Sequence, residues 1–137
     1  MRIYTDGVFD MFHRGHLECF KTIKKLYPDC HLVVGVVSDK DTESYKRIPI
    51  INENDRLEII KSIKYVDEVV FPGPLYMTRQ FIEKHNIDLI VHGFANPADI
   101  NTKQKFFAIP MELGKFKEIP YYSKISTTDI IKKVKDL

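Results

Sequence analysis

Short apolar runs typical of buried strands alternate with helix-like segments along this chain, and that alternation is the strongest constraint on its fold. The clearest run covers residues 31–37, His-Leu-Val-Val-Gly-Val-Val, and is rich in β-branched side chains. Such runs are typical of strands that are covered on both faces, as in a parallel sheet. Strict alternation of strands and helices predicts a doubly wound α/β sheet, mainly parallel, with right-handed crossovers. We therefore expect a single Rossmann-like domain over residues 1–137, built on a five-stranded sheet with helices on both faces.

The expected elements can be placed from periodicity and from turn and cap residues. Strands are expected at residues 2–5, 31–37, 68–71, 88–93 and, as a final edge strand, 119–122. Helices are expected at residues 17–27, after a cap at Asn52 or Asn54, at 78–85, in a weaker form at 103–114, and at 130–137. Residues 38–45 should form a loop or a short helix, and residues 94–102 a polar loop. Because ligands in such sheets bind beyond the carboxyl ends of the strands, the turn after the first strand should share a crevice with the other strand ends.

Composition argues against several classes of protein. The formal net charge is only +2, so the chain carries no general basic field for nucleic acid. No run of about 18 apolar residues occurs, which argues against a transmembrane helix. Residue 2 already belongs to the first expected strand, so we expect no signal or transit peptide. The two cysteines, Cys19 and Cys30, have no metal-binding spacing, and we expect both to be reduced in a cytoplasmic protein.

The stretch from Asp6 to His16, Asp-Gly-Val-Phe-Asp-Met-Phe-His-Arg-Gly-His, connects the first strand to the first helix. Backbone amides at a helix N-terminus attract anions, because the donors of the first turn are unpaired and the helix dipole is positive there. His13 and His16 add two more donors at this end, so the pattern predicts a phosphate-binding turn. Two alternatives stay open on these residues alone. The pair could be zinc ligands, although no third ligand lies at metal spacing, or ordinary capping and surface residues.

Four motifs follow one another along the chain. They are Gly-Val-Phe-Asp with His-Arg-Gly-His within 7–16, Tyr-Lys at 45–46 with Asn-Glu-Asn-Asp-Arg at 52–56, Lys-Tyr-Val-Asp-Glu-Val at 64–69, and Ile-Ser-Thr-Thr-Asp-Ile at 125–130. In this order they resemble the cytidylyltransferase branch of the H-x-G-H nucleotidyltransferases, above all the choline-phosphate and ethanolamine-phosphate cytidylyltransferases. The resemblance spans nearly the whole chain, and four ordered motifs are far more specific than any one alone.

The resemblance implies transfer of CMP from CTP to a phospho-alcohol, phosphoethanolamine or phosphocholine, with release of pyrophosphate. The substrate phosphate would attack the α-phosphorus of CTP in line, a transfer that needs positioning and charge neutralisation more than a protein nucleophile. The implied catalytic residues are His13, His16 and Lys46. The imidazoles would donate to the triphosphate, and the ammonium would bridge the two phosphate groups. From the residues alone, Lys46 would be interpreted as a solvated loop residue.

The resemblance also implies residues that bind the nucleotide and the substrate. The nucleotide-binding set is Gly7, Val8, Phe9, Asp10, Gly15, Arg56, His92, Gly93, Ser126, Thr127 and Thr128, and the substrate-binding set is Lys46, Asp10 and Tyr76. Ser126 and Thr127 would hold the β- and γ-phosphates. Asp10 would orient a histidine or a water on Mg²⁺, which accompanies CTP, and Arg56 would close the site or pair with an acid. As ordinary residues, Ser126 and Thr127 would only cap a helix, Asp10 would be a turn residue, and Arg56 would form a surface pair.

The sequence departs from the family pattern at places that bear on the substrate. Tyr-Tyr-Ser-Lys at 121–124 replaces the family's Arg-Thr-Glu-Gly, and Lys124 lacks the planar fork of the lost arginine. His-Gly-Phe-Ala at 92–95 replaces the family's His-Asp-Asp, so both acids are absent. Leu75 stands where the family often has tryptophan. Because a quaternary ammonium favours aromatic faces, this weakens phosphocholine relative to phosphoethanolamine.

Two other functions stay open on these residues. One is the same fold with another nucleotide or acceptor, as in an adenylyltransferase or a glycerol-3-phosphate cytidylyltransferase, and the other is a non-catalytic nucleotide-binding regulatory protein. By resemblance we expect a homodimer, with the opening motif and residues 64–67 near its interface. We expect no nucleic-acid partner. Because the chain ends at Leu137, we also expect no membrane-binding helix like that which follows the catalytic domain of choline-phosphate enzymes.

Overall fold

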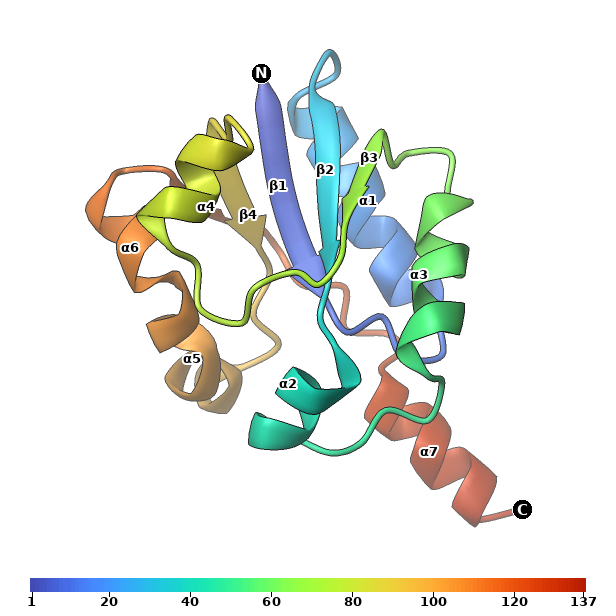
Figure 1. Ribbon diagram of the computed structural model, residues 1–137. Helices are drawn as coiled ribbons and strands as arrows, with labels where there is room; N and C mark the ends of the chain where they lie inside the picture. Colours follow the sequence, from blue (N-terminus) through green and yellow to red (C-terminus); the bar gives the residue numbers. More distant parts are fainter.

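The computed structural model describes all residues 1–137 and consists of one parallel sheet with helices packed around it (Figure 1). The strands are β1 (Arg2–Gly7), β2 (His31–Val36), β3 (Glu68–Val70), β4 (Leu89–His92) and β5 (Phe116–Glu118). Their spatial order is β3-β2-β1-β4-β5, and every neighbouring pair is parallel. The predicted Rossmann-like α/β sheet of five strands is therefore confirmed, and it is parallel throughout.

The helices fall into two groups around the sheet. They are α1 (Arg14–Leu26), α2 (Asp39–Tyr45), α3 (Glu53–Lys61), α4 (Arg79–Lys84), α5 (Pro97–Lys103), the 3₁₀ turn η1 (Gln104–Phe107), α6 (Ala108–Glu112) and α7 (Thr127–Lys135). In Figure 1, α1 and α3 lie to one side of the sheet and α4 to α6 to the other, while α7 projects from the body near the C-terminus. None of the helices has the length and apolar character needed to cross a membrane.

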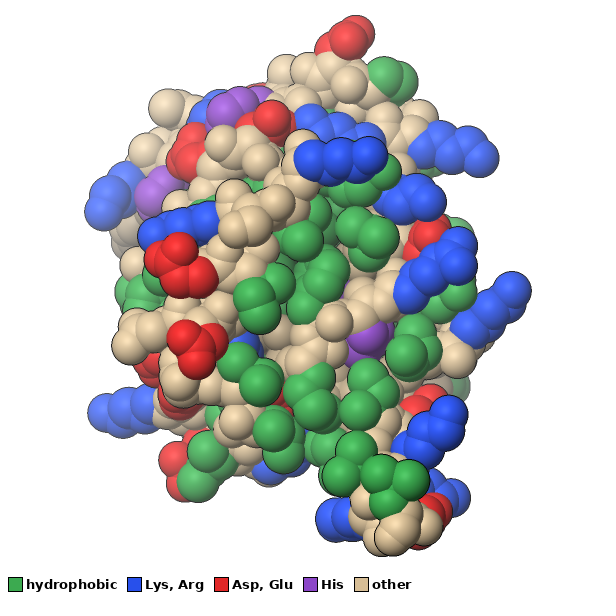
Figure 2. All heavy atoms as spheres, turned by 90° about the vertical axis from the view of Figure 1, so that its right-hand side faces the viewer, with side chains coloured by type: hydrophobic (Ala, Val, Ile, Leu, Met, Phe, Trp, Pro, Cys, Tyr) green, Lys and Arg blue, Asp and Glu red, His purple; other side chains and the backbone are tan.

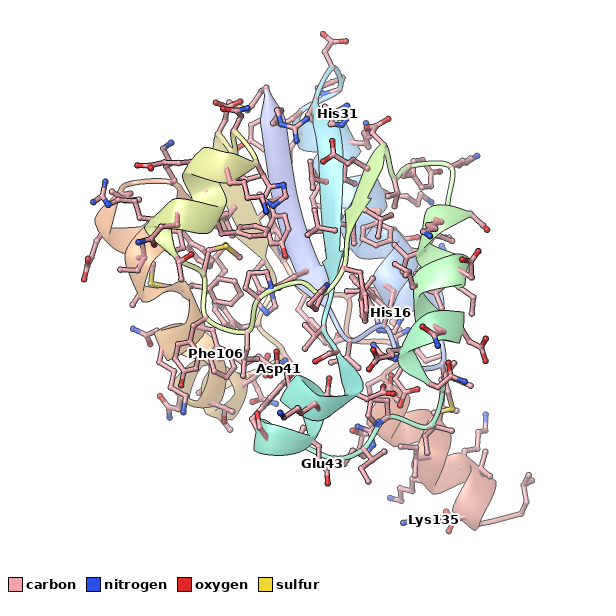
Figure 3. The ribbon with its side chains drawn as sticks, in the orientation of Figure 1. His16, His31, Asp41, Glu43, Phe106 and Lys135 are labelled. Carbon is pink, nitrogen blue, oxygen red and sulfur yellow. The ribbon has the colours of Figure 1, made fainter.

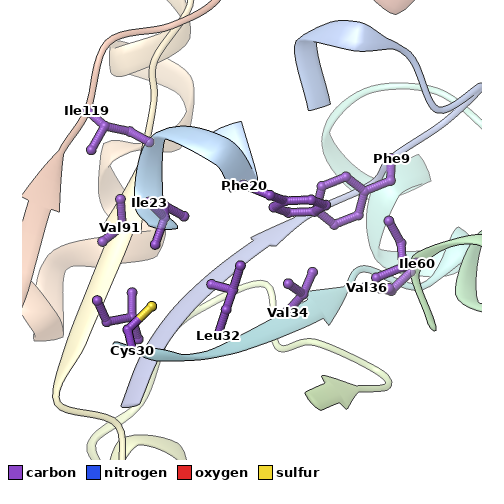
Figure 4. Packing of buried hydrophobic residues seen from close by; sticks show 11 residues of the cluster. Phe9, Phe20, Ile23, Cys30, Leu32, Val34, Val36, Ile60, Val91 and Ile119 are labelled. Carbon is purple, nitrogen blue, oxygen red and sulfur yellow. The ribbon is translucent and has the colours of Figure 1, made fainter. Parts of the chain in front are cut away.

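Adjacent residues of the central strands supply two separate cores, because successive side chains of a strand point to opposite faces. Ile3 and Leu32 join the core formed with α1 and α3, where Phe20 is fully buried (Figure 4). Their neighbours Tyr4 and Val33 join the core formed with α4 and η1. Burial on both faces explains why β2 is apolar along its length.

The edge strand β5 lies before the predicted position of 119–122. It pairs with β4 in the register Ile90↔Phe116 to His92↔Glu118, and the N–H of Ile119 donates to the carbonyl of His92 as the last ladder bond. Pro120 has no N–H to continue the ladder, so the strand ends there. The placement at 119–122 was wrong because the actual strand is short and largely exposed, which leaves little apolar pattern to find.

Residues 94–102, expected to be a polar loop, contain most of α5. The Asn96 side chain caps this helix by accepting a hydrogen bond from the Asp99 N–H, and Pro97 occupies the first helical position. Both residues are favourable at those positions, so the Asn-Pro pair was an overlooked helix start.

The expected helix at 103–114 is divided into η1 and α6. Pro110 is the third residue of α6, where its missing N–H costs no intrahelical bond.

Two other helix starts place the segments around the carboxyl edge of the sheet. α3 begins after the cap Asn52, one of the two predicted caps. α1 begins at Arg14, earlier than the expected residue 17, because His13 acts as its cap. As a result, the turn after β1, the residues after β4, α5 and the start of α7 all border one edge of the sheet (Figure 1).

Candidate active site

A cavity of about 790 Å³ opens at the carboxyl edge of the sheet. Most of the residues predicted for the site line it: Gly7, Val8, Phe9, Asp10, His13, Gly15, His16, Lys46, His92, Gly93, Ser126, Thr127 and Thr128. Two predicted residues, Arg56 and Tyr76, lie outside it. The structure thus brings together segments that are far apart in the sequence.

The two histidines of the opening motif cap α1 and also face the cavity. The Nδ1 atom of His13 accepts a hydrogen bond from the Gly15 N–H at 2.9 Å, and the Nδ1 atom of His16 accepts one from the His13 N–H at 3.1 Å. Their rings are stacked, with 3.9 Å between centroids. Because each Nδ1 is an acceptor, the proton of each neutral ring is on Nε2. Capping therefore leaves one N–H donor on each imidazole.

Both imidazoles are neutral near pH 7. Burial, followed by the charges of His13 and Lys46, lowers the pKa of His16 to about 3. Burial also lowers the pKa of His13. Neutral rings can donate through Nε2 without the cost of placing two like charges in contact.

Gly15 is required by the close approach of the chain on both sides. A Cβ atom at this position would lie 2.7 Å from Cε1 of His13 and 3.3 Å from the carbonyl oxygen of Ile125. The missing side chain therefore lets the capping histidine and the segment before α7 pack against the same helix turn. This packing brings the start of α7 next to the histidine pair.

Asp10 connects three segments of the site. Its carboxylate accepts hydrogen bonds from the N–H groups of Ile50 and Ile51, each at 2.8 Å, and contacts Arg47 at 3.4 Å. Its carbonyl oxygen accepts from the Thr127 hydroxyl at 2.9 Å. The carboxylate contacts neither histidine, contrary to one expected role, because its oxygens hold the loop that follows Lys46. Asp10 therefore positions the lysine loop and α7 relative to the turn after β1.

Arg56 supports the site from behind it. The side chain is fully buried and donates to the carbonyl oxygens of Val8, Val37 and Ile51, and to the carboxylate of Asp39 at 2.6 Å. The predicted pairing with an acid is present, but a direct contact with nucleotide is not supported, because the guanidinium is committed to these partners outside the cavity. Arg56 instead fixes the backbone at the ends of β1 and β2.

Lys46 supplies a cation without a partner in the chain. It follows α2 and is an exposed residue whose side chain lines the cavity, where it forms no ion pair. Burial, with the charges of Lys103 and Arg47, lowers its pKa. An unpaired, partly desolvated ammonium is well placed to neutralise a phosphate.

The start of α7 adds further donors. The Ser126 hydroxyl accepts from the Asp129 N–H at 3.1 Å, and the Thr127 hydroxyl is committed to Asp10. Both residues are thus caps or anchors, as the simpler interpretation held. The N–H groups of Thr127 and Thr128 belong to the first turn and lack intrahelical acceptors, so they remain free for an anion.

The far end of the cavity contains residues to which the sequence analysis gave no role. They are Asp6 at the end of β1 and Asp99 and Lys103 on α5. Lys103 forms an ion pair with Asp99 at 3.0 Å, and His92 Nδ1 lies 4.0 Å from Asp6. Asp99 and Lys103 were missed because residue 99 was expected in a loop at 94–102 and residue 103 in the next helix, at 103–114. The Asn-Pro helix start would have placed them on one helix face.

Tyr76 does not line the cavity, so its expected contact with substrate is not supported. Its side chain is about half exposed, and its ring packs edge-on against Phe106 at 4.9 Å between centroids. The neighbouring Leu75 lines the cavity in its place. The Pro-Gly-Pro turn fixes the chain direction here, but sequence reasoning could not tell which of two adjacent side chains points inward.

Comparison with known proteins assigns the family. A family model described as cytidylyltransferase-like matches residues 4–133. The chain belongs to the cytidylyltransferase-like family. It is 36% identical over 135 residues to choline-phosphate cytidylyltransferase 2 of Arabidopsis thaliana, covering 98% of this chain and 44% of that protein. It is 34% identical over 135 residues to ethanolamine-phosphate cytidylyltransferase of the same plant, covering 96% of this chain and 31% of that protein. The chain thus spans less than half the length of these relatives.

A solved structure is similar to this chain in both fold and sequence. The crystal structure of the lipopolysaccharide core biosynthesis protein from Thermoplasma volcanium matches with a TM-score of 0.70 and 30% sequence identity, covering 90% of this chain and 98% of that one. A protein from Archaeoglobus fulgidus described as of unknown function matches with a TM-score of 0.56 and 19% identity, which shows the shared fold alone.

The residues of this cytidylyltransferase-like chain do not form a metal site by themselves. No group of three or more His, Cys, Asp or Glu side chains is close enough to hold an ion. The carboxylate oxygens of Asp10 are already occupied by backbone N–H groups. A divalent ion in this cavity would therefore need ligands from a bound nucleotide, which suits Mg²⁺ because it binds phosphate oxygens and retains waters.

Proposed function

We propose that this chain transfers CMP from CTP to a phospho-alcohol, giving a CDP-alcohol and pyrophosphate. The observation that carries the proposal is the convergence of the two imidazoles, Lys46 and the start of α7 on one cavity. Membership of the cytidylyltransferase-like family supports CTP as the nucleotide. The relatives' names, choline-phosphate and ethanolamine-phosphate cytidylyltransferase, support a phospho-alcohol acceptor.

The reaction requires two anions to be held next to each other. An oxygen of the acceptor phosphate attacks the α-phosphorus of CTP, and the bond from that phosphorus to the oxygen bridging to the β-phosphate breaks. Pyrophosphate leaves with the electron pair of that bond. No covalent bond to the protein is needed, so the chain contributes positioning and charge neutralisation.

Each part of the cavity has a role in this transfer. The Nε2–H donors of His13 and His16 hydrogen-bond to oxygens of the α- and β-phosphates, where negative charge grows in the transition state. The Lys46 ammonium lies between the α-phosphate and the acceptor phosphate and reduces their repulsion. The free N–H groups at the start of α7 hold the β- and γ-phosphates. Mg²⁺, carried by the triphosphate, would neutralise part of its charge.

We also propose a homodimer, as the family resemblance implies. Exposed apolar side chains lie before α3, on α3 and on α7, including Ile50, Ile59 and Val134. Figure 2 shows apolar side chains gathered across the face that carries these helices. Burying such a surface against a second copy would be favourable. Sedimentation equilibrium should give twice the monomer mass, and a monomer at all concentrations would contradict the dimer.

The test of the proposed function is pyrophosphate release with CTP and a panel of acceptors: glycerol 3-phosphate, phosphoethanolamine and phosphocholine. We expect turnover with CTP and at least one acceptor. Turnover with ATP alone would favour an adenylyltransferase. CTP binding without turnover for any acceptor would favour a non-catalytic nucleotide-binding protein.

A matched pair of histidine variants tests the catalytic assignment. His16→Ala should lower kcat by about 10²–10³-fold, the usual cost of one transition-state donor. His31→Ala is the control, because His31 lies at the amino end of β2, opposite to His16, and its side chain hydrogen-bonds to Glu68, outside the cavity (Figure 3). The control should retain full activity. A fully active, folded His16→Ala variant would contradict the assigned role.

A further inference from the structure

The far end of the cavity contains four titratable side chains to which the proposed transfer gives no step, and one of them, His92, was expected from the sequence to bind the nucleotide. Asp6 and His92 come from the ends of β1 and β4, and Asp99 and Lys103 from α5. Figure 1 shows α5 and α7 on opposite flanks of the carboxyl edge. The charges of Lys103 and Asp99 act on Lys46, the cation assigned to the acceptor phosphate, so we take this far end to face the acceptor when α7 holds the triphosphate. The inference that follows therefore rests on the proposed function and narrows its acceptor.

The charges of this end are already largely balanced. Asp99 accepts from the Ala95 N–H at 2.9 Å and pairs with Lys103 at 3.0 Å. Burial, and then the Lys103 charge, lowers the pKa of His92 to about 4. Burial raises the pKa of Asp6 to about 7, although Lys103 opposes the increase. The ion pair has no net charge and the imidazole is neutral, so only the partly protonated Asp6 carboxyl offers negative charge to a fixed positive group.

The groups at this end do have unused hydrogen-bonding capacity. His92 Nε2 is buried without a partner, and its Nδ1 is too far from Asp6, at 4.0 Å, for a strong bond. No other side chain hydrogen-bonds to the Asp6 carboxyl. Buried polar atoms without partners are costly, and a ligand hydroxyl, which both donates and accepts, can satisfy either group.

The two phenylalanine rings at this end are packed against other rings rather than open to a quaternary ammonium. Phe106 is contacted edge-on by Tyr45, at 5.4 Å between centroids. The ring of Phe107 packs against His92 at 4.7 Å and Phe116 at 5.2 Å. The chain contains no tryptophan, the best cation–π partner. Phe106 and Phe107 are thus used in packing against neighbouring rings.

We propose that the far end, with Asp99 and Lys103 of α5 as its specificity residues, accepts the hydroxyl groups of a phosphorylated polyol and disfavours acceptors that end in an ammonium. Lys103 is the repulsive element: its ammonium would lie near any cationic end of the acceptor. Such like-charge opposition is an effective way to reject a competing ligand. Asp6 and His92 supply the hydrogen bonds to the hydroxyl groups.

The experiment compares kcat/KM for glycerol 3-phosphate, phosphoethanolamine and phosphocholine, with CTP, in the full chain. We expect glycerol 3-phosphate to be preferred by about tenfold or more. Lys103→Met removes the repulsive charge and frees the Asp99 carboxylate, so the ratio of kcat/KM values should move toward the ammonium acceptors by about tenfold. The readout is a ratio measured within each variant, which a general loss of stability does not change.

Lys105→Met is the matched control, because Lys105 is exposed, lies on the neighbouring turn and does not line the cavity. Its substitution should leave the acceptor ratio as in the unmodified chain. A preference for phosphoethanolamine or phosphocholine, or a ratio unaffected by Lys103→Met, would overturn this inference while leaving the proposed transfer intact. Absence of turnover with all three acceptors would overturn the transfer and this inference together.

Discussion

Several residues at this site hold the local backbone in place and also leave groups free to bind a ligand. His13 and His16 use Nδ1 to cap α1, which leaves Nε2 for a ligand. Asp10 uses its carboxylate to hold the lysine loop and its carbonyl oxygen to hold α7. The simpler interpretation of each residue as a cap or a turn former is therefore compatible with a role in phosphate binding.

Asp10→Asn tests the positioning role of Asp10. The amide replaces one acceptor oxygen with an NH₂ group that faces a backbone N–H, so unfolding free energy should fall by about 1–3 kcal/mol. Because Lys46 would lose its fixed loop, kcat with CTP should also fall. Urea unfolding and steady-state kinetics measure the two effects. Unchanged stability and activity would show that these hydrogen bonds do not organise the site.

At the scale of elements, α7 is held to the body mainly through its first turn. Thr127 is nearly buried and hydrogen-bonds to Asp10, whereas Val134 and the end of the helix are exposed. The anion-binding end of the helix is thus its anchored end. Its position for triphosphate binding is set by this hydroxyl contact together with the close packing of the segment before α7 against Gly15.

Thr127→Val removes that contact with little change of volume. We expect unfolding free energy to fall by about 1 kcal/mol, and KM for CTP to rise more than kcat falls. Thr128→Val is the control for stability alone, because its hydroxyl is exposed and has no partner, and its unfolding free energy should not change. Equal stability of the two variants would exclude the proposed anchor.

Strongly patterned elements were predictable from sequence, and weakly patterned ones were not. The apolar run of β2 and the caps Asn52 and Ser126 were recognised from local chemistry. The edge strand β5 was misplaced because it is short and exposed, and α5 was missed although Asn96 and Pro97 mark its start. The far end of the cavity was overlooked with α5, because Lys103 and Asp6 meet only through the tertiary fold.

For the whole molecule, the sheet topology places two kinds of group at one edge: neutral donors near α7 and a charge-balanced cluster near α5. The folded protein keeps His16 and His92 neutral and favours protonated Asp6. The histidines, whose folded pKa values are lowered, lose stabilisation as the pH falls below about 6.5. Asp6, whose folded pKa is raised, loses stabilisation as the pH rises from about 4 toward 7.

Asp6→Asn isolates the contribution of Asp6 to the pH dependence of stability, because the amide cannot ionise. The unfolding free energy of the variant relative to the unmodified chain should increase between pH 4 and pH 7, by at most about 1.4 kcal/mol per pH unit, and then level off. Urea titrations across this range measure the difference. A difference that is constant with pH would contradict a carboxyl titrating near pH 7 in the folded protein.

The most direct test of the central claim is ³¹P nuclear magnetic resonance of the chain with CTP, Mg²⁺ and glycerol 3-phosphate. If the histidine pair, Lys46 and the start of α7 hold one triphosphate for attack by a second phosphate, the resonances of a diphosphate diester and of pyrophosphate should appear together in equal amounts. They should be absent on the same timescale with His16→Ala. Orthophosphate as the only new species, or an unchanged spectrum with each of the three acceptors, would contradict the account.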